Sequence, residues 1–310
     1  MSTVADREPA APVVEKTPAV QSPWRRFAAD FAESRLALLG LALLVTLLMV
    51  AVLAPVISPQ NPYDLAQLDV MDSKLPPGEH SSTTNKPYWL GTDDQGRDML
   101  SGIFYGLRIS LAVGIASTVC ALAIGLLLGL GAAYFGGWLD TLVMRLADIQ
   151  LSFPAILIAL ILLAVLGQGI DKIIIALVTV QWAYYARTVR SAALVERQKE
   201  YIEAARGLGL SRARIVLRHL LPNCLPPLIV VATVQVAHAI ALEATLSFLG
   251  LGLPITEPSL GLLIANGFQY LLSGKYWISF YPGLALLLTI VAINLVADQL
   301  RDVLNPRLRR

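Results

Sequence analysis

The stretch from Glu203 to Pro222 reads EAARGLGLSRARIVLRHLLP. It is polar and basic, and long apolar segments lie on both sides of it. Gly207 and Gly209 can end a first helix, because glycine freely takes the left-handed conformation of a sharp turn. Ser211 can cap a second helix. The pattern predicts a short helix–turn–helix outside the membrane, with a surface that another protein can bind.

The two halves of this loop have different patterns. Residues 195–206 contain good helix formers and no Pro or Gly, so we expect one continuous helix there. In the second half an apolar stripe is expected from residues at three- and four-residue steps: Leu210, Ala213, Leu217 and Leu220. An alternative is a basic amphipathic loop lying on anionic lipid. Nucleic-acid binding is disfavoured, because no aromatic residues alternate with the basic ones.

The composition indicates a membrane protein. Apolar residues make up 56% of the 310 and charged residues only 15%, against about 25% charged in soluble domains. A membrane-spanning helix needs about 20 mostly apolar residues. The predicted fold is therefore all-α and polytopic, with six transmembrane helices and the polar loop at 195–222 between two of them. The six expected spans are 36–57, 109–139, 149–170, 173–186 with its basic extension, 223–242 and 276–297.

The distribution of basic residues predicts the orientation. With the N-terminus inside, only six of the 24 basic residues lie outside, and the other 18 lie on the cytoplasmic side. Both termini are therefore expected in the cytoplasm. The predicted regions are a cytoplasmic tail 1–35, a first span 36–57, an extracytoplasmic segment 58–108, a five-helix core 109–297 and a cytoplasmic tail 298–310. Within the core we expect a docking loop at 195–222 and an outer re-entrant segment at 247–275.

Four local patterns refine this outline. Thr92, Asp93 and Asp94 are good caps for a helix starting near Gln95, which is expected to lie on the membrane surface or to contact a substrate-delivering protein. Small residues four apart (Gly125, Gly129 and Ala133) predict a second span inside the bundle. Pro154 predicts a kink in the third span. Glycines and prolines in 247–275 predict a helix over about 258–272 that dips into the mouth of the bundle.

Polar residues inside the spans are candidates for a transport path, because such side chains usually face the interior of a bundle. The candidates are Gln235, His238, Glu243 and Asn294. Hydrogen bonding between helices is the alternative role for such residues. No catalytic constellation, metal-binding pattern or phosphate loop is found, so the chain is expected to be neither an enzyme nor an ATP-binding protein.

Several motifs resemble one family. They are LGTDDQGRD at 90–98, YFGGWLD at 134–140, SFLGLGLP at 247–254, LRDVLNPRLR at 300–309 and the spacing of the 203–222 loop. Together they resemble the second membrane subunit of dipeptide and oligopeptide ABC importers. The resemblance places the family's ATPase-coupling motif on Glu203, Ala204, Ala205, Gly209, Leu221 and Pro222. His219 departs from it, because the family usually has Ile there.

The resemblance implies a permease that moves short peptides across a bacterial cytoplasmic membrane by alternating access. It implies a homologous second permease as partner, two ATPase subunits that bind ATP and Mg, and an extracytoplasmic substrate-binding protein. The chain itself would bind no cofactor and contact only lipid and these proteins. Nickel, glutathione or another small solute is an alternative cargo. An ion-coupled secondary transporter is a less favoured alternative, since the spans contain few acidic residues.

Overall fold

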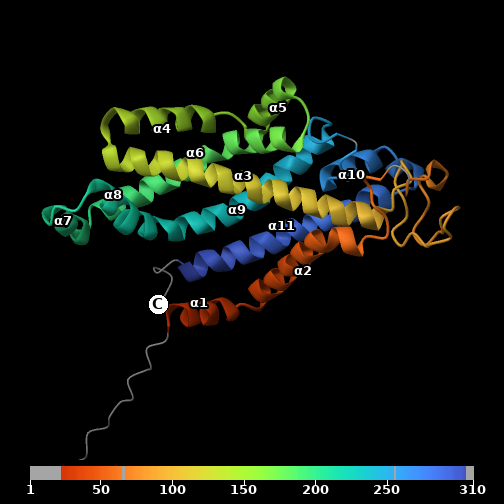
Figure 1. Cartoon of the computed structure of the whole chain (residues 1–310), viewed down its shortest axis with the longest axis horizontal. Helices are drawn as coiled ribbons and strands as arrows, with labels where there is room; N and C mark the ends of the chain where they lie inside the picture. The colour runs from red at the N-terminus through yellow and green to blue at the C-terminus, as the bar shows by residue number, and fades with distance from the viewer. Residues whose placement is uncertain (1–21, 65–66, 255, 305–310) are drawn as a thin grey trace, which may run out of the picture.

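The computed structural model describes residues 22–64, 67–254 and 256–304, which form an elongated helical bundle (Figure 1). Most of the predicted N-terminal tail (1–21) and the last six residues (305–310) lie outside the described residues. Within the described residues the extended pairing is limited to isolated bridges, His80–Pro87 and Thr92–Asp98. The elements are α1 (Pro23–Ala32), α2 (Arg35–Ile57), η2 (Val70–Asp72), α3 (Met99–Phe135), α4 (Gly137–Leu151), α5 (Ala155–Leu166), α6 (Ile170–Arg197), α7 (Glu200–Gly207), α8 (Arg212–Arg214), η3 (Ile215–Leu220), α9 (Leu221–Phe248), α10 (Leu260–Phe268), η4 (Leu271–Ser273) and α11 (Trp277–Leu304).

Helices α3 and α6 form the centre of the bundle, and small residues let them approach closely. A Cβ atom on Gly125 would lie 2.6 Å from the carbonyl oxygen of Trp182, and one on Gly129 would lie 2.4 Å from that of Ala186. Ala133 is also buried. The prediction that this span lies inside the bundle is confirmed, because only glycine permits such backbone contact.

The remaining long helices complete the apolar core. Leu47 of α2, Met99 of α3, Ile240 of α9 and Ile293 of α11 belong to one buried cluster. Four helical segments are long and apolar enough to cross a membrane, and five if α4 and α5 count as one bent span. Helix α6 has 28 residues, about 42 Å, but its basic C-terminal half lowers its hydropathy. The polytopic all-α fold is confirmed, while the number six stays a prediction.

The start of α3 corrects one expectation. No separate surface helix begins near Gln95; the chain instead enters α3 at Met99 and continues as one helix to Phe135. The cap is Asp98, whose carboxylate accepts a hydrogen bond from the backbone N–H of Ser101 at 2.9 Å. The capping residue is thus Asp98, and not Thr92, Asp93 or Asp94 as predicted. The helix that it begins is the second predicted span.

The third predicted span is broken rather than kinked. Helices α4 and α5 meet at 92°, because Pro154 takes an extended conformation (φ −57°, ψ 127°) and disfavours helix in the residue before it. Helix α4 instead lies along α6. Arg190 makes two hydrogen bonds to the Asp140 carboxylate, and Arg187 pairs with Asp148. These ion pairs join α4 to α6.

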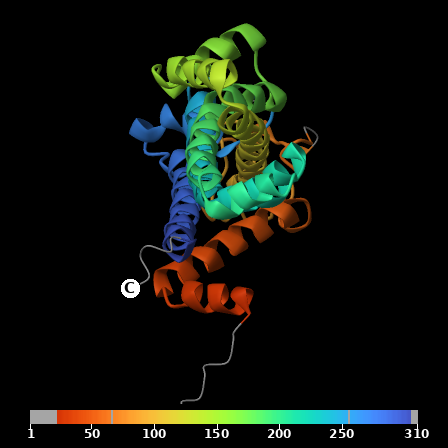
Figure 2. The same ribbon diagram turned by 90° about the vertical axis from the view of Figure 1, so that its left-hand side faces the viewer.

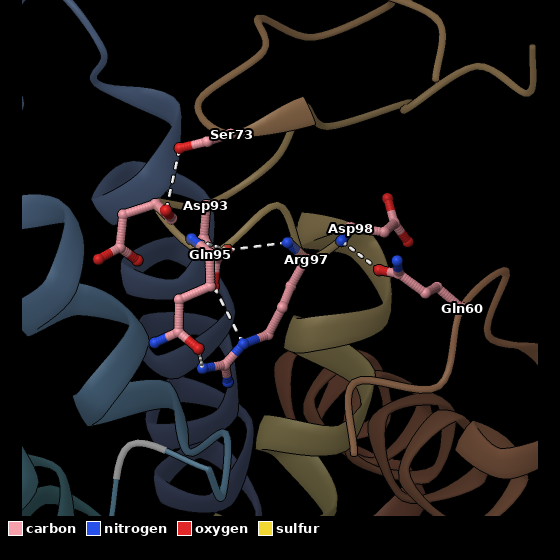
Figure 3. Close-up of polar contacts among 7 residues, drawn as sticks. Gln60, Ser73, Asp93, Gln95, Arg97 and Asp98 are labelled. Atoms are coloured by element: carbon pink, nitrogen blue, oxygen red, sulfur yellow. Dashed lines mark hydrogen bonds and ion pairs between the residues drawn. The ribbon is translucent and has the colours of Figure 1, made fainter. Parts of the chain in front are cut away.

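The connection between α2 and α3 folds around buried polar groups (Figure 3). Asp93 accepts hydrogen bonds at Oδ1 from the backbone N–H groups of Gln95 and Arg97, both at 2.9 Å. Its Oδ2 lies 3.5 Å from Nε of Arg97, an ion pair longer than a hydrogen bond. The N–H of Asp98 donates to the side-chain oxygen of Gln60 at 2.6 Å. The polar side chains of the 90–98 motif thus hold this connection together from inside.

The bundle has two distinct ends. The loop of α7, α8 and η3 lies at one end, together with α1 and the last turn of α11, and the α2–α3 connection and α10 lie at the other (Figure 1). Figure 2 views the molecule from the loop end. Helix α10 lies within the predicted re-entrant segment, and its N-cap Ser259 accepts a hydrogen bond from the N–H of Leu262 at 3.2 Å.

Candidate docking site and translocation path

The first helix of the docking loop begins later than predicted. Helix α6 ends at Arg197 and α7 begins at Glu200, so the continuous helix expected over 195–206 is wrong. The break follows from local side-chain contacts rather than from Pro or Gly. Glu196 pairs with Lys199 (Nζ–Oε2 2.8 Å) and accepts a hydrogen bond from the hydroxyl of Tyr201. These contacts favour the extended conformation of Lys199 (ψ 146°).

The Glu-Ala-Ala part of the motif lies on α7, and its three residues face different ways. Glu203 and Ala204 are exposed at the end of the molecule. Ala205 is buried beside Ile202 in the core cluster that α6, α7 and η3 share. Ala204 is therefore available to a facing surface, whereas Ala205 lets α7 pack on its own chain.

The turn after α7 depends on Gly209. Its φ of +73° lies in the left-handed region, whereas Gly207 is the last helical residue. No other atom lies within 4 Å of the position that a Cβ on Gly209 would occupy. Backbone conformation, and not space, therefore requires glycine here. Ser211 caps the next helix as predicted, accepting a hydrogen bond from the N–H of Arg214.

The apolar face of the second half differs from the predicted stripe. Residues 215–220 form a π-helix, and its wider turn changes which residues share a face. Ile215 and Leu220 are buried, while Leu217 is 62% exposed and Ala213 is also exposed. Leu208, in the preceding turn, is 80% exposed. The loop thus leaves Leu208 and Leu217 exposed, while Ile215 and Leu220 pack against the bundle.

A chain of hydrogen bonds ties the two ends of the loop together. Nδ2 of Asn223 donates to the hydroxyl oxygen of Tyr201 at 3.1 Å and to the carbonyl oxygen of His219 at 2.7 Å. The Tyr201 hydroxyl in turn donates to Glu196. Burial, and then the Glu196 carboxylate, raise the pKa of Tyr201 to about 12, so it stays a donor at neutral pH. No sequence pattern predicts these hydrogen bonds, because the bonded residues are 5 and 22 positions apart.

His219, the residue that departs from the family motif, packs against Tyr201 of this hydrogen-bond network. The ring of His219 is half-buried, with its centroid 6.4 Å from that of Tyr201. Leu221 and Pro222, which complete the motif, form the first turn of α9. The missing N–H of Pro222 is tolerated there, since a proline fits the first turn of a helix.

The candidate path residues do not converge on one site. Gln235 is buried and lines a groove of about 680 Å³ between α9 and α11, which we call the α9–α11 groove. His238 is exposed on α9, and Asn294 is half-buried on α11. Glu243 is fully buried, and its carboxylate accepts hydrogen bonds from Ser110 (2.9 Å) and Ser247 (2.8 Å). Glu243 therefore joins α9 to α3.

No cluster of three or more His, Cys, Asp or Glu residues that could hold a metal ion occurs within the part of the chain that the structure describes.

Comparison with known proteins defines the class. Residues 121–310 match the family described as the binding-protein-dependent transport system inner membrane component, and residues 22–77 match the N-terminal transmembrane domain of oligopeptide transport permease C. The chain belongs to this family of transport permeases. The resemblance to ABC importer permeases of the peptide type is thereby confirmed.

Similar proteins cover nearly the whole chain. A dipeptide transport system permease of Alkalihalophilus pseudofirmus is 35% identical over 97% of this chain and 96% of its own length. A di/tripeptide transport system permease of Pseudomonas aeruginosa is 36% identical over 96% of this chain and 97% of its own length. A putative peptide transport system permease of Brucella suis is 42% identical over 87% of this chain and 88% of its own.

A solved structure shares the fold. The MetNI methionine ABC transporter in an inward-facing conformation matches with a TM-score of 0.54 and 24% identity, over 67% of this chain and 98% of the matched chain. At this identity the match supports the arrangement of the helices and nothing further.

Proposed function

We propose that this chain is the permease subunit of an ATP-driven importer that moves short peptides across a bacterial cytoplasmic membrane. The observation that carries the proposal is the docking loop, a separate α7–α8–η3 unit at one end of a bundle of apolar helices. The names of the similar permeases, which refer to dipeptides, di/tripeptides or peptides, support peptide cargo.

The docking loop supports an ATPase partner. Glu203 and Ala204 are exposed, as are Leu208 and Leu217, so the loop offers a carboxylate and apolar side chains to a partner. Exposed apolar side chains on a loop outside the bundle suit a protein interface. Two ATPase subunits would bind ATP and Mg, and this chain would bind neither and catalyse nothing. A homologous second permease would complete the membrane part.

The orientation that fits this function has six spans and both termini in the cytoplasm. The start of α1, the end of α11 and the docking loop all lie at one end of the bundle, and the eight basic residues from Arg187 to Arg218 belong to that end or lead to it. The positive-inside tendency favours placing this end in the cytoplasm. The α2–α3 connection then faces outward.

The outer end suits contact with a substrate-binding protein. In the α2–α3 connection most polar motif residues are buried and Asp94 and Gln95 are half-buried, while Val70, Met71 and Trp89 are exposed at 77%, 83% and 67%. These apolar side chains, and not Asp93 or Asp94, are the proposed contact surface. Inside the bundle, the proposed path passes Gln235, with His238, Glu243 and Asn294 as further candidates.

Transport would follow alternating access. ATP binding closes the ATPase pair, and the docking loops carry that movement into α6 and α9. The cavity then opens outward to receive cargo from the binding protein. ATP supplies the difference in free energy between the two states that such a shift requires.

One observation favours the ion-coupled alternative. Glu243 is a carboxylate buried within a long apolar helix, which is typical of proton and ion pathways. Its hydrogen bonds to Ser110 and Ser247 give it a structural role without an ion, so ATP-driven import remains the proposal.

Uptake by reconstituted complexes tests the proposal. Both permeases, the ATPases and the binding protein are placed in proteoliposomes, and entry of labelled dialanine is measured with ATP, with a non-hydrolysable analogue, and with ion gradients collapsed. We expect uptake only with hydrolysable ATP, regardless of ion gradients. Excess nickel or glutathione should not compete. ATP-independent uptake that follows an ion gradient would contradict the proposal, and competition by nickel or glutathione would reassign the cargo.

A further inference from the structure

The α9–α11 groove has walls of two chemical kinds. Its apolar lining consists of two prolines and three valines of α9 together with Ala297 and Leu304 of α11. Its polar groups come from Tyr184, Asn223, Gln235, Asp298 and Arg301. Its volume of about 680 Å³ lies in the range of roughly 300–1,000 Å³ that is common for small-molecule sites.

Two opposite charges lie side by side in this groove. Asp298 and Arg301 are three residues apart on α11, so they occupy the same face of the helix, with Cβ atoms about 5–6 Å apart. Both are exposed. The ion pairs of the described residues involve other partners, and neither Asp298 nor Arg301 is among them. Both charges are therefore open to a ligand.

These two charges can bind the two ends of a short peptide. A free peptide carries an ammonium group at one end and a carboxylate at the other, and two extended residues span at most about 7 Å. The flexible Arg301 side chain can adjust to a second or third residue. A guanidinium also binds a carboxylate through two parallel hydrogen bonds, which fixes its orientation.

The remaining lining suits peptides of varied sequence. The amide side chains of Gln235 and Asn223 can each donate and accept a hydrogen bond, as a peptide backbone requires. The prolines and valines offer an apolar wall that selects no particular side chain. Such a site would bind the two ends of the peptide and make no specific contact with the side chains of the peptide.

We propose that the α9–α11 groove is a binding site for short zwitterionic peptides on the cytoplasmic side of the permease. Arg301 binds the terminal carboxylate, and Asp298 binds the terminal ammonium group. This inference rests on the proposed peptide cargo. Because both charges are exposed and screened by salt, each pair contributes little, and binding is weak enough to release cargo into the cytoplasm.

Binding to the complex without its substrate-binding protein tests the inference. The two permeases and the ATPases are held in nanodiscs, and dialanine binding is measured by saturation-transfer NMR. We expect a millimolar dissociation constant for dialanine and at least tenfold weaker binding of N-acetyl-dialanine amide, which lacks both charges. The second ligand needs no mutation, so a folding defect cannot imitate the result.

Variants assign the site to the groove. Arg301→Gln and Asp298→Asn should each weaken dialanine binding at least fivefold. The matched controls, Asp302→Asn on the same helix and Arg145→Gln on α4, remove exposed charges outside the groove and should bind as wild type. Equal binding of the capped and free peptides, or wild-type binding by both groove variants, would overturn the inference.

The uptake assay separates this inference from the proposed function. If proteoliposomes take up dialanine but the groove variants bind it normally, only the inner site is wrong. If dialanine is not taken up by the wild-type complex at all, the peptide cargo fails and the site assignment fails with it.

Discussion

Asn223 donates a hydrogen bond from Nδ2 to the hydroxyl oxygen of Tyr201, at 3.1 Å, and so joins the first turn of α9 to α7. The Tyr201 hydroxyl in turn donates a hydrogen bond to Glu196, near the end of α6. Asn223 also lines the α9–α11 groove. One side chain therefore contacts both the docking loop and the groove, and we propose that movement of the loop reaches the proposed path through this pair.

Tyr201→Phe tests that route. The substitution removes the hydroxyl but keeps the ring beside His219. The lost hydrogen bond has a carboxylate as acceptor, and such bonds contribute about 1.5–3 kcal/mol. We expect the amount of peptide transported per ATP hydrolysed to fall several-fold at normal membrane abundance. Tyr276→Phe, at the opposite end of the bundle, serves as the control. An unchanged transport-to-ATPase ratio in Tyr201→Phe would show that the hydroxyl only stabilises the loop.

Gly129→Ala tests the contact between α3 and α6. The added Cβ would lie 2.4 Å from the carbonyl oxygen of Ala186, so the helices must separate. Overpacking of this kind costs about 1–3 kcal/mol. We expect a lower melting temperature in detergent and reduced membrane abundance. Gly131→Ala is the matched control, because no other atom lies within 4 Å of its Cβ position; an equal effect of both substitutions would mean that close packing is not the cause.

Much of the fold could be predicted from the sequence, because the apolar runs and the small residues act locally. The spacing of Gly125 and Gly129 was enough to predict close packing, and Ser211 was enough to predict a cap. The start of α3 was missed because Thr92 and Asp93 are equally good capping residues, and only the folded connection buries them. The right-angle break at Pro154 was underestimated, since a proline in sequence does not reveal how far the following helix turns.

The candidate site was predictable in position but not in detail. The spacing from Glu203 to Pro222 located the loop, whereas the π-helix changed which of its leucines are buried. The hydrogen bonds among Glu196, Tyr201 and Asn223 depend on tertiary contact and left no periodic signal. Among the path candidates, polarity alone could not distinguish Gln235, which lines a groove, from Glu243, which joins two helices.

Cysteine labelling tests the proposed orientation. In a variant with Cys120 and Cys224 replaced by serine, single cysteines are placed at Leu75 in the α2–α3 connection and at Leu217 in the docking loop. Leu217 is chosen because it is 62% exposed, whereas the neighbouring Ile215 is 2% exposed. A membrane-impermeant reagent should label position 75 in intact cells and position 217 only after lysis. Labelling of position 217 from outside would reverse the orientation.

The stability of the α2–α3 connection should depend on pH through Asp93. Burial raises its pKa from 3.8 to about 6, and Arg97 and two backbone N–H groups offset this only in part. Between about pH 4 and 6 the Asp93 carboxyl is therefore protonated in the folded connection and ionised in the unfolded chain. Stability from this group is thus highest at low pH and falls as pH rises through that window, by at most about 3 kcal/mol.

Hydrogen exchange measures this dependence. After correction for intrinsic rates, protection of the Gln95 and Arg97 amides should decrease from pH 4.5 to 6.5 in the wild type. Asp93→Asn removes the titrating group and should abolish that slope. The difference between the two proteins isolates Asp93, because the pKa of Asp98 is also raised by burial and that of Asp72 is lowered by hydrogen bonds that outweigh its burial. Protection that increases with pH in the wild type alone would mean that Arg97 dominates.

Gly209 should be the position of the docking loop at which substitution reduces transport most. The φ of +73° strains any β-branched residue, at a cost on the order of 1–3 kcal/mol, although space for a side chain is present. Gly209→Val should abolish ATP-driven uptake and substrate-stimulated ATPase activity while the chain stays in the membrane. Gly209→Asn should retain most activity, since Asn tolerates the left-handed conformation. Gly207→Ala, at a helical glycine with equal space, should transport normally. Normal coupling in Gly209→Val at equal abundance would show that the turn geometry is not needed to engage the ATPase.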